Sequence, residues 1–170
     1  MDARHVVVMG VAGCGKSAVG RQLAQQLGLP MVEGDDFHPP ANIRKMQQGT
    51  ALTDEDRADW LDSLAQALVA QPGGAVLSCS ALKAAYRDAL RRAMPGLRFV
   101  YLRITESESQ RRVASRPGHF YPPSLVASQF EALQDPSAEP GVLALDGTLS
   151  RDALAGRAAA WLRQGPDLPG

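Results

Sequence analysis

The sequence predicts an α/β domain built on a central parallel β-sheet, and three observations lead to that prediction. Five short apolar segments alternate with stretches of helical periodicity, and strands joined through helices pair in parallel with right-handed crossovers. A glycine-rich turn joins the first apolar segment to the first helical stretch. The length of 170 residues is that of one domain with a substantial core, so we expect a single domain over residues 1–170.

The glycine-rich turn fits the pattern G-x-x-x-x-G-K-[ST] over residues 10–17, after an apolar strand at residues 5–9. In a strand-to-helix turn, these glycines let backbone N–H groups point into one concavity at a helix N-terminus, which binds phosphate. Lys16 would reach the β- and γ-phosphates, and the Ser17 hydroxyl would bind Mg²⁺. The turn therefore predicts a P-loop for a nucleoside triphosphate, with contacts from Gly10, Gly13, Cys14, Gly15, Lys16, Ser17 and Ala18.

Charge and composition argue against several other functions. Lys plus Arg and Asp plus Glu number 18 each, so no net field draws the chain to nucleic acid or to a membrane surface. No apolar run approaches the ~18 residues of a membrane span, and the N-terminal run is too short for a signal peptide. We expect a cytoplasmic protein with a small-molecule substrate, no nucleic-acid or membrane partner, and a homodimer as a possible assembly.

Two cysteines form neither a disulfide framework nor a zinc site, and they suggest a reducing compartment. Cys14 lies in the P-loop, where backbone N–H groups, Lys16 and a helix start would favour its thiolate. We expect its thiol to be exposed in the empty site, with a side chain turned into the core as the alternative.

An acidic cluster follows the second predicted strand, residues 29–33. Ligands of open parallel sheets sit beyond the carboxyl ends of strands, so Asp35 or Asp36 could orient and deprotonate a substrate hydroxyl. Either could instead hold a water of the Mg²⁺ shell or belong to a solvated acidic turn. The third strand, residues 75–79, ends without the aspartate that often completes a P-loop metal site, so the acidic cluster is the expected source of that ligand.

Residues 37–73 would form an acceptor-binding insert, with a short helix at 42–48 and a longer helix capped by Thr53. Asp54 and Asp56 either cap this helix, where its dipole favours acids, or act as ligands. Lys45 and Arg57 would bind an anion or be solvated surface charges.

A lid is predicted at about residues 117–125, after a fourth strand at 97–104 and a helix at 105–116. Arg112 and Arg116 lie on one face of that helix, and Pro and Gly follow it. An arginine pair that feeds a mobile loop suits closure over a transferring phosphoryl group, although a plain helix and surface loop would look the same. A fifth strand at 142–145 and a helix capped by Ser150 complete the core, predicted as residues 1–36 and 75–164.

Five strands, an insert after the second and a lid after the fourth indicate a P-loop NTPase of nucleoside-monophosphate-kinase-like architecture. By analogy with that class, we expect helices on both faces of the sheet and the strand order 2-3-1-4-5.

Several blocks of sequence resemble the gluconokinase family of P-loop small-molecule kinases. They are residues 10–17, 34–39, 42–46, 52–57, 79–83, 118–120 and 128–131, and the resemblance extends over about residues 6–145. It implies ATP- and Mg²⁺-dependent phosphorylation of D-gluconate at its terminal hydroxyl, which gives 6-phosphogluconate. One departure is visible: relatives often carry Asp-x-Asp ahead of the His-Pro, and here the first acid is Glu33.

The resemblance also implies roles for individual residues. Lys16, Asp35 and Arg116 would be catalytic, with Asp35 facing the acceptor hydroxyl. Arg112 and Arg116 would contact ATP from the lid. Candidates for the polyol and its carboxylate are His38, Lys45, Arg57, Lys83 and Arg87.

A P-loop is also compatible with two other functions. A kinase for shikimate or a nucleoside monophosphate shares the P-loop and the lid, and residue types alone do not name the acceptor. A GTP-dependent switch would need D-x-x-G after the third strand and N/T-K-x-D later. The D-x-x-G at residues 167–170 lies in the tail and the second motif is absent, so the sequence disfavours a switch.

Overall fold

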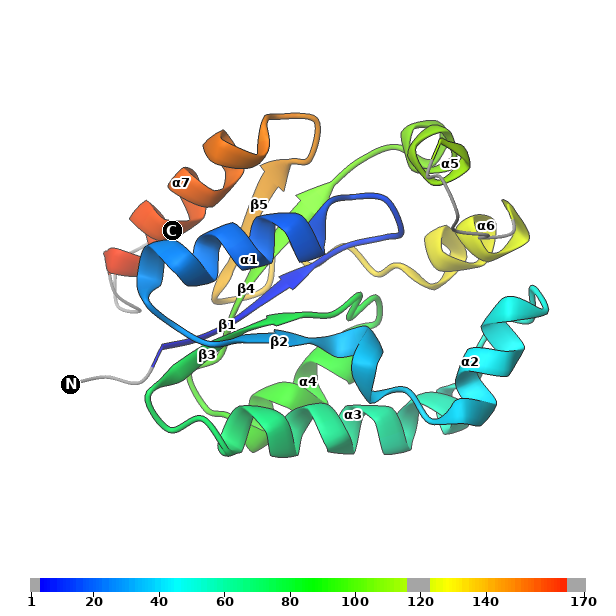
Figure 1. Cartoon of the computed structure of the whole chain (residues 1–170), viewed down its shortest axis with the longest axis horizontal. Coiled ribbons are helices and arrows are strands. Elements are labelled where there is room, and N and C mark those ends of the chain that lie inside the picture. Colours follow the sequence, from blue (N-terminus) through cyan, green and yellow to red (C-terminus); the bar gives the residue numbers. More distant parts are fainter. Residues whose placement is uncertain (1–3, 116–122, 165–170) are drawn as a thin grey trace.

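The computed structural model describes residues 4–115 and 123–164. At its centre is a twisted parallel sheet of five strands (Figure 1). The strand order is β2-β3-β1-β4-β5, which confirms the predicted fold class and the predicted order. The strands are β1 (Arg4–Met9), β2 (Met31–Glu33), β3 (Gly74–Ser78), β4 (Arg98–Arg103) and β5 (Val142–Asp146).

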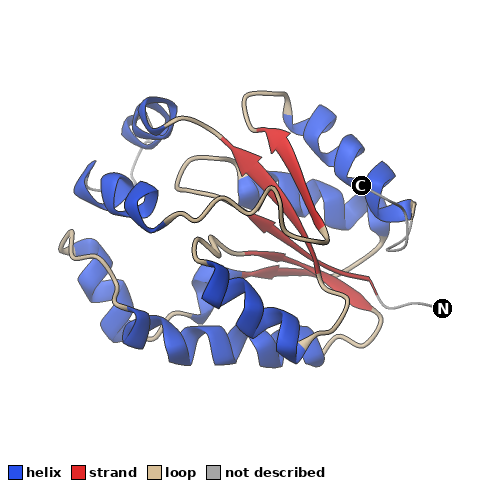
Figure 2. Ribbon diagram, turned by 180° about the vertical axis from the view of Figure 1, so that it is seen from behind, coloured by secondary structure: helices blue, strands red, loops and turns tan. Residues whose placement is uncertain are grey.

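Helices cover both faces of the sheet, as Figures 1 and 2 show from opposite sides. One face carries α1 (Lys16–Leu27) and α7 (Arg151–Arg163), and the other carries α3 (Asp54–Val69) and α4 (Ala84–Ala93). Beyond the carboxyl ends of the strands lie α2 (Pro40–Gln47), α5 (Glu106–Ala114) and α6 (Pro123–Ala132). A single 3₁₀ turn, η1 (Gly34–Phe37), follows β2.

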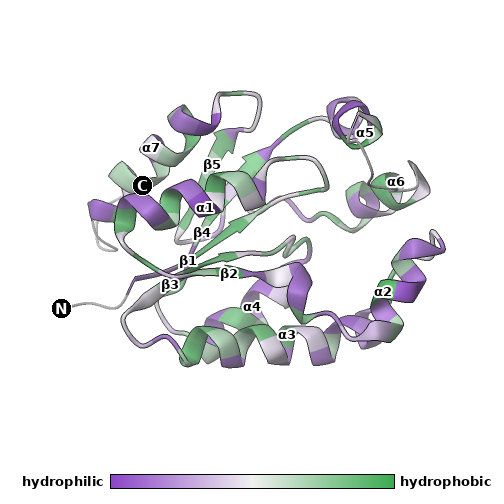
Figure 3. Cartoon of the chain, viewed as in Figure 1, coloured by the Kyte–Doolittle hydropathy of each residue, from purple (hydrophilic) through white to green (hydrophobic). Residues whose placement is uncertain are grey.

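The core consists of two apolar layers that meet at the sheet. Along β1, Val6 and Val8 point into the layer shared with α1 and α7, whereas Val7 and Met9 point into the layer shared with α3 and α4. Because both faces are covered, the strands read as continuous apolar runs rather than alternating ones. Figure 3 shows the strands as mostly hydrophobic, whereas hydrophilic and hydrophobic residues alternate along the helices.

Part of the predicted insert belongs to this core. Leu61, Leu64 and Leu68 of α3 are buried against the sheet, so only α2 and its flanking loops stand beyond the strand ends. The strand order places β1 between β3 and β4, with β2 next to β3. Parallel pairing thus brings the loops after β1, β2 and β3 to one edge of the sheet.

Candidate active site

The P-loop has the backbone geometry that phosphate binding requires. Gly13 and Gly15 have φ values of 78° and 94°, in the left-handed region that favours glycine. Gly15 is also the N-cap of α1 and offers no side-chain cap, so the first N–H groups of the helix meet no side-chain acceptor at the cap. This helix start is ready to receive an anion.

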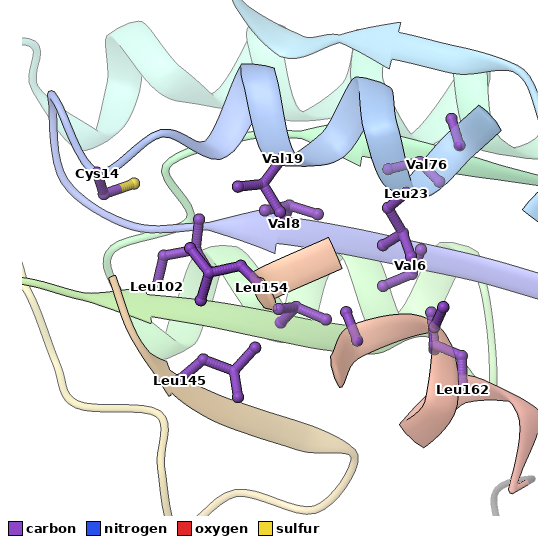
Figure 4. Packing of buried hydrophobic residues seen from close by; sticks show 14 of the residues in the cluster. Val6, Val8, Cys14, Val19, Leu23, Val76, Leu102, Leu145, Leu154 and Leu162 are labelled. Carbon is purple, nitrogen blue, oxygen red and sulfur yellow. The ribbon is translucent and has the colours of Figure 1, made fainter. Parts of the chain in front are cut away.

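Cys14 differs from the expectation of an exposed thiol. Its side chain is 1% exposed and packs into the core layer that contains Val8, Val19 and Leu102 (Figure 4). A Cβ added at Gly10 would lie 2.7 Å from the Cys14 Sγ, so this glycine makes room for the sulfur. The expectation of an exposed thiol was therefore wrong, because the side chain is turned into the core.

A cleft of about 450 Å³ opens at the carboxyl edge of the sheet. Its lining combines the P-loop and α1 with η1, the insert, the loop after β3 and the helices α5 and α6. Of the residues that the sequence singled out, it brings together Gly13, Gly15, Lys16, Ser17, Ala18, Asp35, His38 and Arg57. Asp36, the alternative to Asp35, does not line it.

The η1 turn is held in place by α3. Gly34 packs so closely on β3 that an added Cβ would lie 2.3 Å from the Ser78 carbonyl oxygen. The Trp60 Nε1–H donates to the Gly34 carbonyl at 2.7 Å. The same indole stacks on the His38 ring, with 4.3 Å between centroids and 10° between planes. These contacts fix the segment that presents Asp35 and His38 to the cleft.

Burial lowers the pKa of His38, Arg57 lowers it further, and the Asp35 carboxylate partly opposes both. The imidazole is therefore neutral at physiological pH, and its Nδ1 lies 3.3 Å from the Asn42 Nδ2. Because the Asn42 amide nitrogen can only donate, Nδ1 accepts this bond and the ring proton lies on Nε2, which can donate to a polyol oxygen.

Lys45 and Lys83 are occupied by ion pairs outside the cleft lining. Lys45 pairs with Asp56 at 2.8 Å, and Lys83 pairs with Asp54 at 2.8 Å. The Thr53 cap is confirmed, because its hydroxyl and the Asp56 carboxylate form a reciprocal capping box. The Lys45 ammonium, the Thr53 N–H and the Thr53 hydroxyl hold the pKa of Asp56 at about 2.

Arg87 is not in the cleft lining either, which corrects its expected role as a substrate ligand. Its side chain is completely buried and forms an ion pair with Glu139. Its remaining donors bond the carbonyls of Ala81, Leu82 and Gln134. No guanidinium N–H is thus left for an acceptor molecule.

Two arginines do face the cleft. Arg57 lies with its guanidinium carbon 5.5 Å from the centre of the Tyr86 ring. Arg21 was missed by the sequence analysis, although it lies four residues after Ser17 and so on the same face of α1. Neither has an ion pair with any residue the structure describes, so both are available to an anion.

Glu33 reaches the position where the metal is expected. The Ser17 hydroxyl donates to the Glu33 Oε1 at 3.0 Å and lies 3.2 Å from the Ser78 Oγ. The longer glutamate arm therefore still brings a carboxylate to the hydroxyl of the P-loop. These hard oxygen donors suit Mg²⁺.

Helices α5 and α6 hydrogen-bond to the P-loop backbone at Ala12. Ser109 of α5 donates to the Ala12 carbonyl at 2.6 Å, and the Gln129 Oε1 of α6 accepts from the Ala12 N–H at 2.7 Å. Arg112 donates to the carbonyls of Gly13 at 3.0 Å and Gly147 at 3.1 Å. Arg112 thus contacts the P-loop backbone but does not line the cleft, and its expected contact with ATP stays a prediction.

Arg116 and residues 117–122 of the predicted lid lie outside the described residues. The roles assigned to them stay predictions. The remaining part of the predicted lid, residues 123–125, forms the start of α6.

The fold and the cleft together define a P-loop kinase. Comparison with known proteins agrees: a family described as an AAA domain matches residues 6–140. The thermoresistant gluconokinase of Escherichia coli K12 is 43% identical over 149 residues, which are 85% of each chain. The gluconokinase of Gluconobacter oxydans is 43% identical over 158 residues, 91% of this chain and 88% of its own.

A solved structure shows the same likeness in three dimensions. The crystal structure of a gluconokinase from Sinorhizobium meliloti 1021 superposes with a TM-score of 0.88 at 46% sequence identity. The match covers 95% of this chain and 92% of that one. The chain belongs to the gluconokinase family.

None of the helices in the described part of the chain is long and apolar enough to span a membrane. A cytoplasmic location and a homodimer stay predictions.

Proposed function

We propose that the protein transfers the γ-phosphoryl group of ATP to the terminal hydroxyl of D-gluconate, giving 6-phospho-D-gluconate and ADP. One observation carries this proposal. A single cleft has the phosphate-binding Lys16 and Ser17 on one wall, and Asp35, His38 and Arg57 on the facing elements. Relatives named gluconokinases, at about 40% identity or more over most of the chain, support the choice of acceptor.

Lys16 and the N–H groups at the start of α1 would bind the phosphates and stabilise negative charge on the transferring group. Asp35 would accept a hydrogen bond from the acceptor hydroxyl and aim its oxygen at phosphorus. As the new O–P bond forms, the bond from phosphorus to the bridging oxygen of ADP breaks, and the hydroxyl proton passes to Asp35. Because phosphoryl transfer is loose, alignment by Asp35 contributes as much as proton removal.

Arg57 would bind the carboxylate of the sugar acid through charge-assisted hydrogen bonds, since it has no ion pair with any residue described. Neutral His38 would bond hydroxyls of the polyol. Ser17 and, next to it, Glu33 would hold Mg²⁺, which when bound neutralises charge on the β- and γ-phosphates.

An assay coupled to ADP release tests the proposal with gluconate, shikimate and nucleoside monophosphates as acceptors. We expect turnover with gluconate well above that with the others. Asp35→Asn should lower kcat by roughly 10²-fold or more with the KM for ATP retained, on the scale of a lost transition-state contact. Asp36→Asn is the matched control and should stay within about threefold of wild type. Preferred turnover of another acceptor, or equal damage from both substitutions, would overturn the assignment.

A further inference from the structure

Arg87 is a completely buried cation whose donors are all used. Its Nη1 donates to the carbonyls of Ala81 at 2.7 Å and Leu82 at 3.0 Å. Its Nη2 donates to the Gln134 carbonyl at 2.9 Å, and its Nε donates to the Glu139 Oε1 at 3.0 Å. A buried charge is tolerated only when it is paired and fully hydrogen-bonded, and this guanidinium meets both conditions. The Ala81 and Leu82 carbonyls belong to the loop that follows β3, so Arg87 holds that loop in place.

That loop contains a strained residue. Ala81 has a φ of 47°, and in the described part of the chain it is the one residue other than glycine with a positive φ. A side chain with a Cβ adopts this conformation only where its surroundings impose it. Ala81 is completely buried, and its carbonyl is one of the two that Arg87 bonds. The strained backbone and the contact with the guanidinium therefore belong to the same residue, Ala81.

The loop connects the cleft with α6. Ser80, next to Ala81, lines the cleft. On the other side, the Gln134 N–H donates to the Leu82 carbonyl at 2.8 Å, and the Ala84 N–H donates to the Gln134 Oε1 at 2.7 Å. Gln134 follows α6, the helix whose Gln129 bonds the Ala12 N–H of the P-loop. The segment made of α6 and Gln134 thus contacts both the P-loop and the loop that carries Ser80.

We propose that Arg87 is a positioning residue for the acceptor: it imposes the left-handed conformation at Ala81 and so holds Ser80 in the wall of the cleft. Arg87 touches no substrate itself. The identity of the acceptor rests on the proposed function, whereas the positioning of Ser80 by Arg87 rests on the contacts above.

Arg87→Lys is the test, because an ammonium keeps the charge but cannot span acceptors on three sides as the planar guanidinium does. We expect the KM for gluconate to rise about tenfold or more while the KM for ATP stays within twofold. Arg91→Lys is the matched control. Arg91 shares Glu139 at 2.9 Å but bonds none of the loop carbonyls, so both KM values should stay within twofold.

A rescue experiment separates positioning from a merely structural role. Glycine adopts a positive φ without strain, so Ala81→Gly in the Arg87→Lys background should bring the KM for gluconate back to within about threefold of wild type. If Arg87 only stabilised the fold, its loss would reduce the fraction of active enzyme and leave both KM values unchanged. That outcome, or an equal rise in both KM values, would overturn the proposal.

Glu139→Gln provides a second route should Arg87→Lys fail to fold. It removes the charge partner of Arg87 but retains an oxygen acceptor, and Glu139 is partly solvated, with 23% of its side chain exposed. We expect a threefold to tenfold rise in the KM for gluconate, and an unchanged value would contradict the proposal. Wild-type enzyme that prefers another acceptor would refute the proposed function alone, and the KM comparison would then be made with that acceptor.

Discussion

Trp60→Phe should damage both the stability of the fold and the catalytic geometry, although Trp60 lies beneath the cleft. The side chain is 1% exposed. Its indole N–H donates to the Gly34 carbonyl at 2.7 Å, and its ring stacks on His38 at 4.3 Å. Phenylalanine fills part of the same space and keeps an aromatic face, but it has no N–H group.

The expected loss follows from these contacts. Removing the donor from a buried carbonyl costs about 1–3 kcal/mol. Weakening the stack on His38 adds up to about 1 kcal/mol. We therefore expect the free energy of unfolding to fall by about 1–4 kcal/mol. For a domain of this size that lowers Tm by roughly 2–16 °C.

Activity should fall as well, because η1 carries Asp35 and a small displacement of an aligning group is costly. We expect kcat with gluconate to drop roughly tenfold or more, with the KM for ATP unchanged. Urea unfolding and the coupled assay measure the two effects. Trp161→Phe is the matched control, since Trp161 is only partly buried on α7 and should lose under about 1 kcal/mol. A Trp60→Phe enzyme with wild-type stability and wild-type kcat would refute the idea that α3 positions the η1 turn.

Three further predictions concern single side chains. Lys16→Ala should lower kcat by roughly 10²-fold or more, measured by ADP release. A variant with wild-type kcat would show that Lys16 does not stabilise the transferring phosphoryl group. Because the pKa of His38 lies below its ordinary value of 6.5, the unfolded chain binds the proton more readily, and stability should fall as the pH drops below 6.5. Urea unfolding at pH 7 and pH 5.5 should show a smaller decline for His38→Gln than for wild type, and equal declines would contradict this assignment. Cys14 and Cys79 are each 1% exposed, and burial raises the pKa of Cys79 to about 12. Both should resist a thiol alkylator until the protein unfolds, so rapid labelling of native enzyme would contradict the buried geometry.

The features predicted correctly from the sequence depend on interactions between near neighbours. The glycines of the P-loop, the Thr53 cap and the apolar strands are set by conformational preferences within a few residues. The strand order came from analogy with P-loop kinases, and the structure confirms it. The same local patterns placed Lys16 and Asp35 at strand ends, where parallel topology brings them into one cleft.

The features that the sequence analysis missed depend on distant partners. The resemblance made Arg87 a candidate ligand of the acceptor, but this buried arginine pairs with Glu139, which lies 52 positions later in the chain. Lys83 finds Asp54 at a separation of 29 positions. The sequence within a few residues of Lys83 or Arg87 does not indicate these ion pairs. The direction of the Cys14 side chain is also set from a distance, by the core layer beneath the loop.

These ion pairs also explain how a chain with 18 basic and 18 acidic residues can present a positive cleft. Lys83 and Arg87 are each neutralised by an acid outside the cleft lining. Among the described residues that line the cleft, the charged side chains are Lys16, Arg21 and Arg57, and one carboxylate, that of Asp35. Because a cleft with low-dielectric walls focuses this local excess, it attracts anions even though the whole molecule carries no net charge. A kinase for a sugar acid must hold two anions at once, and these unpaired cations provide for both. We expect the Asp35 carboxylate to act on the hydroxyl that is to be phosphorylated, whereas Glu33 lies beside Ser17, where the metal is expected.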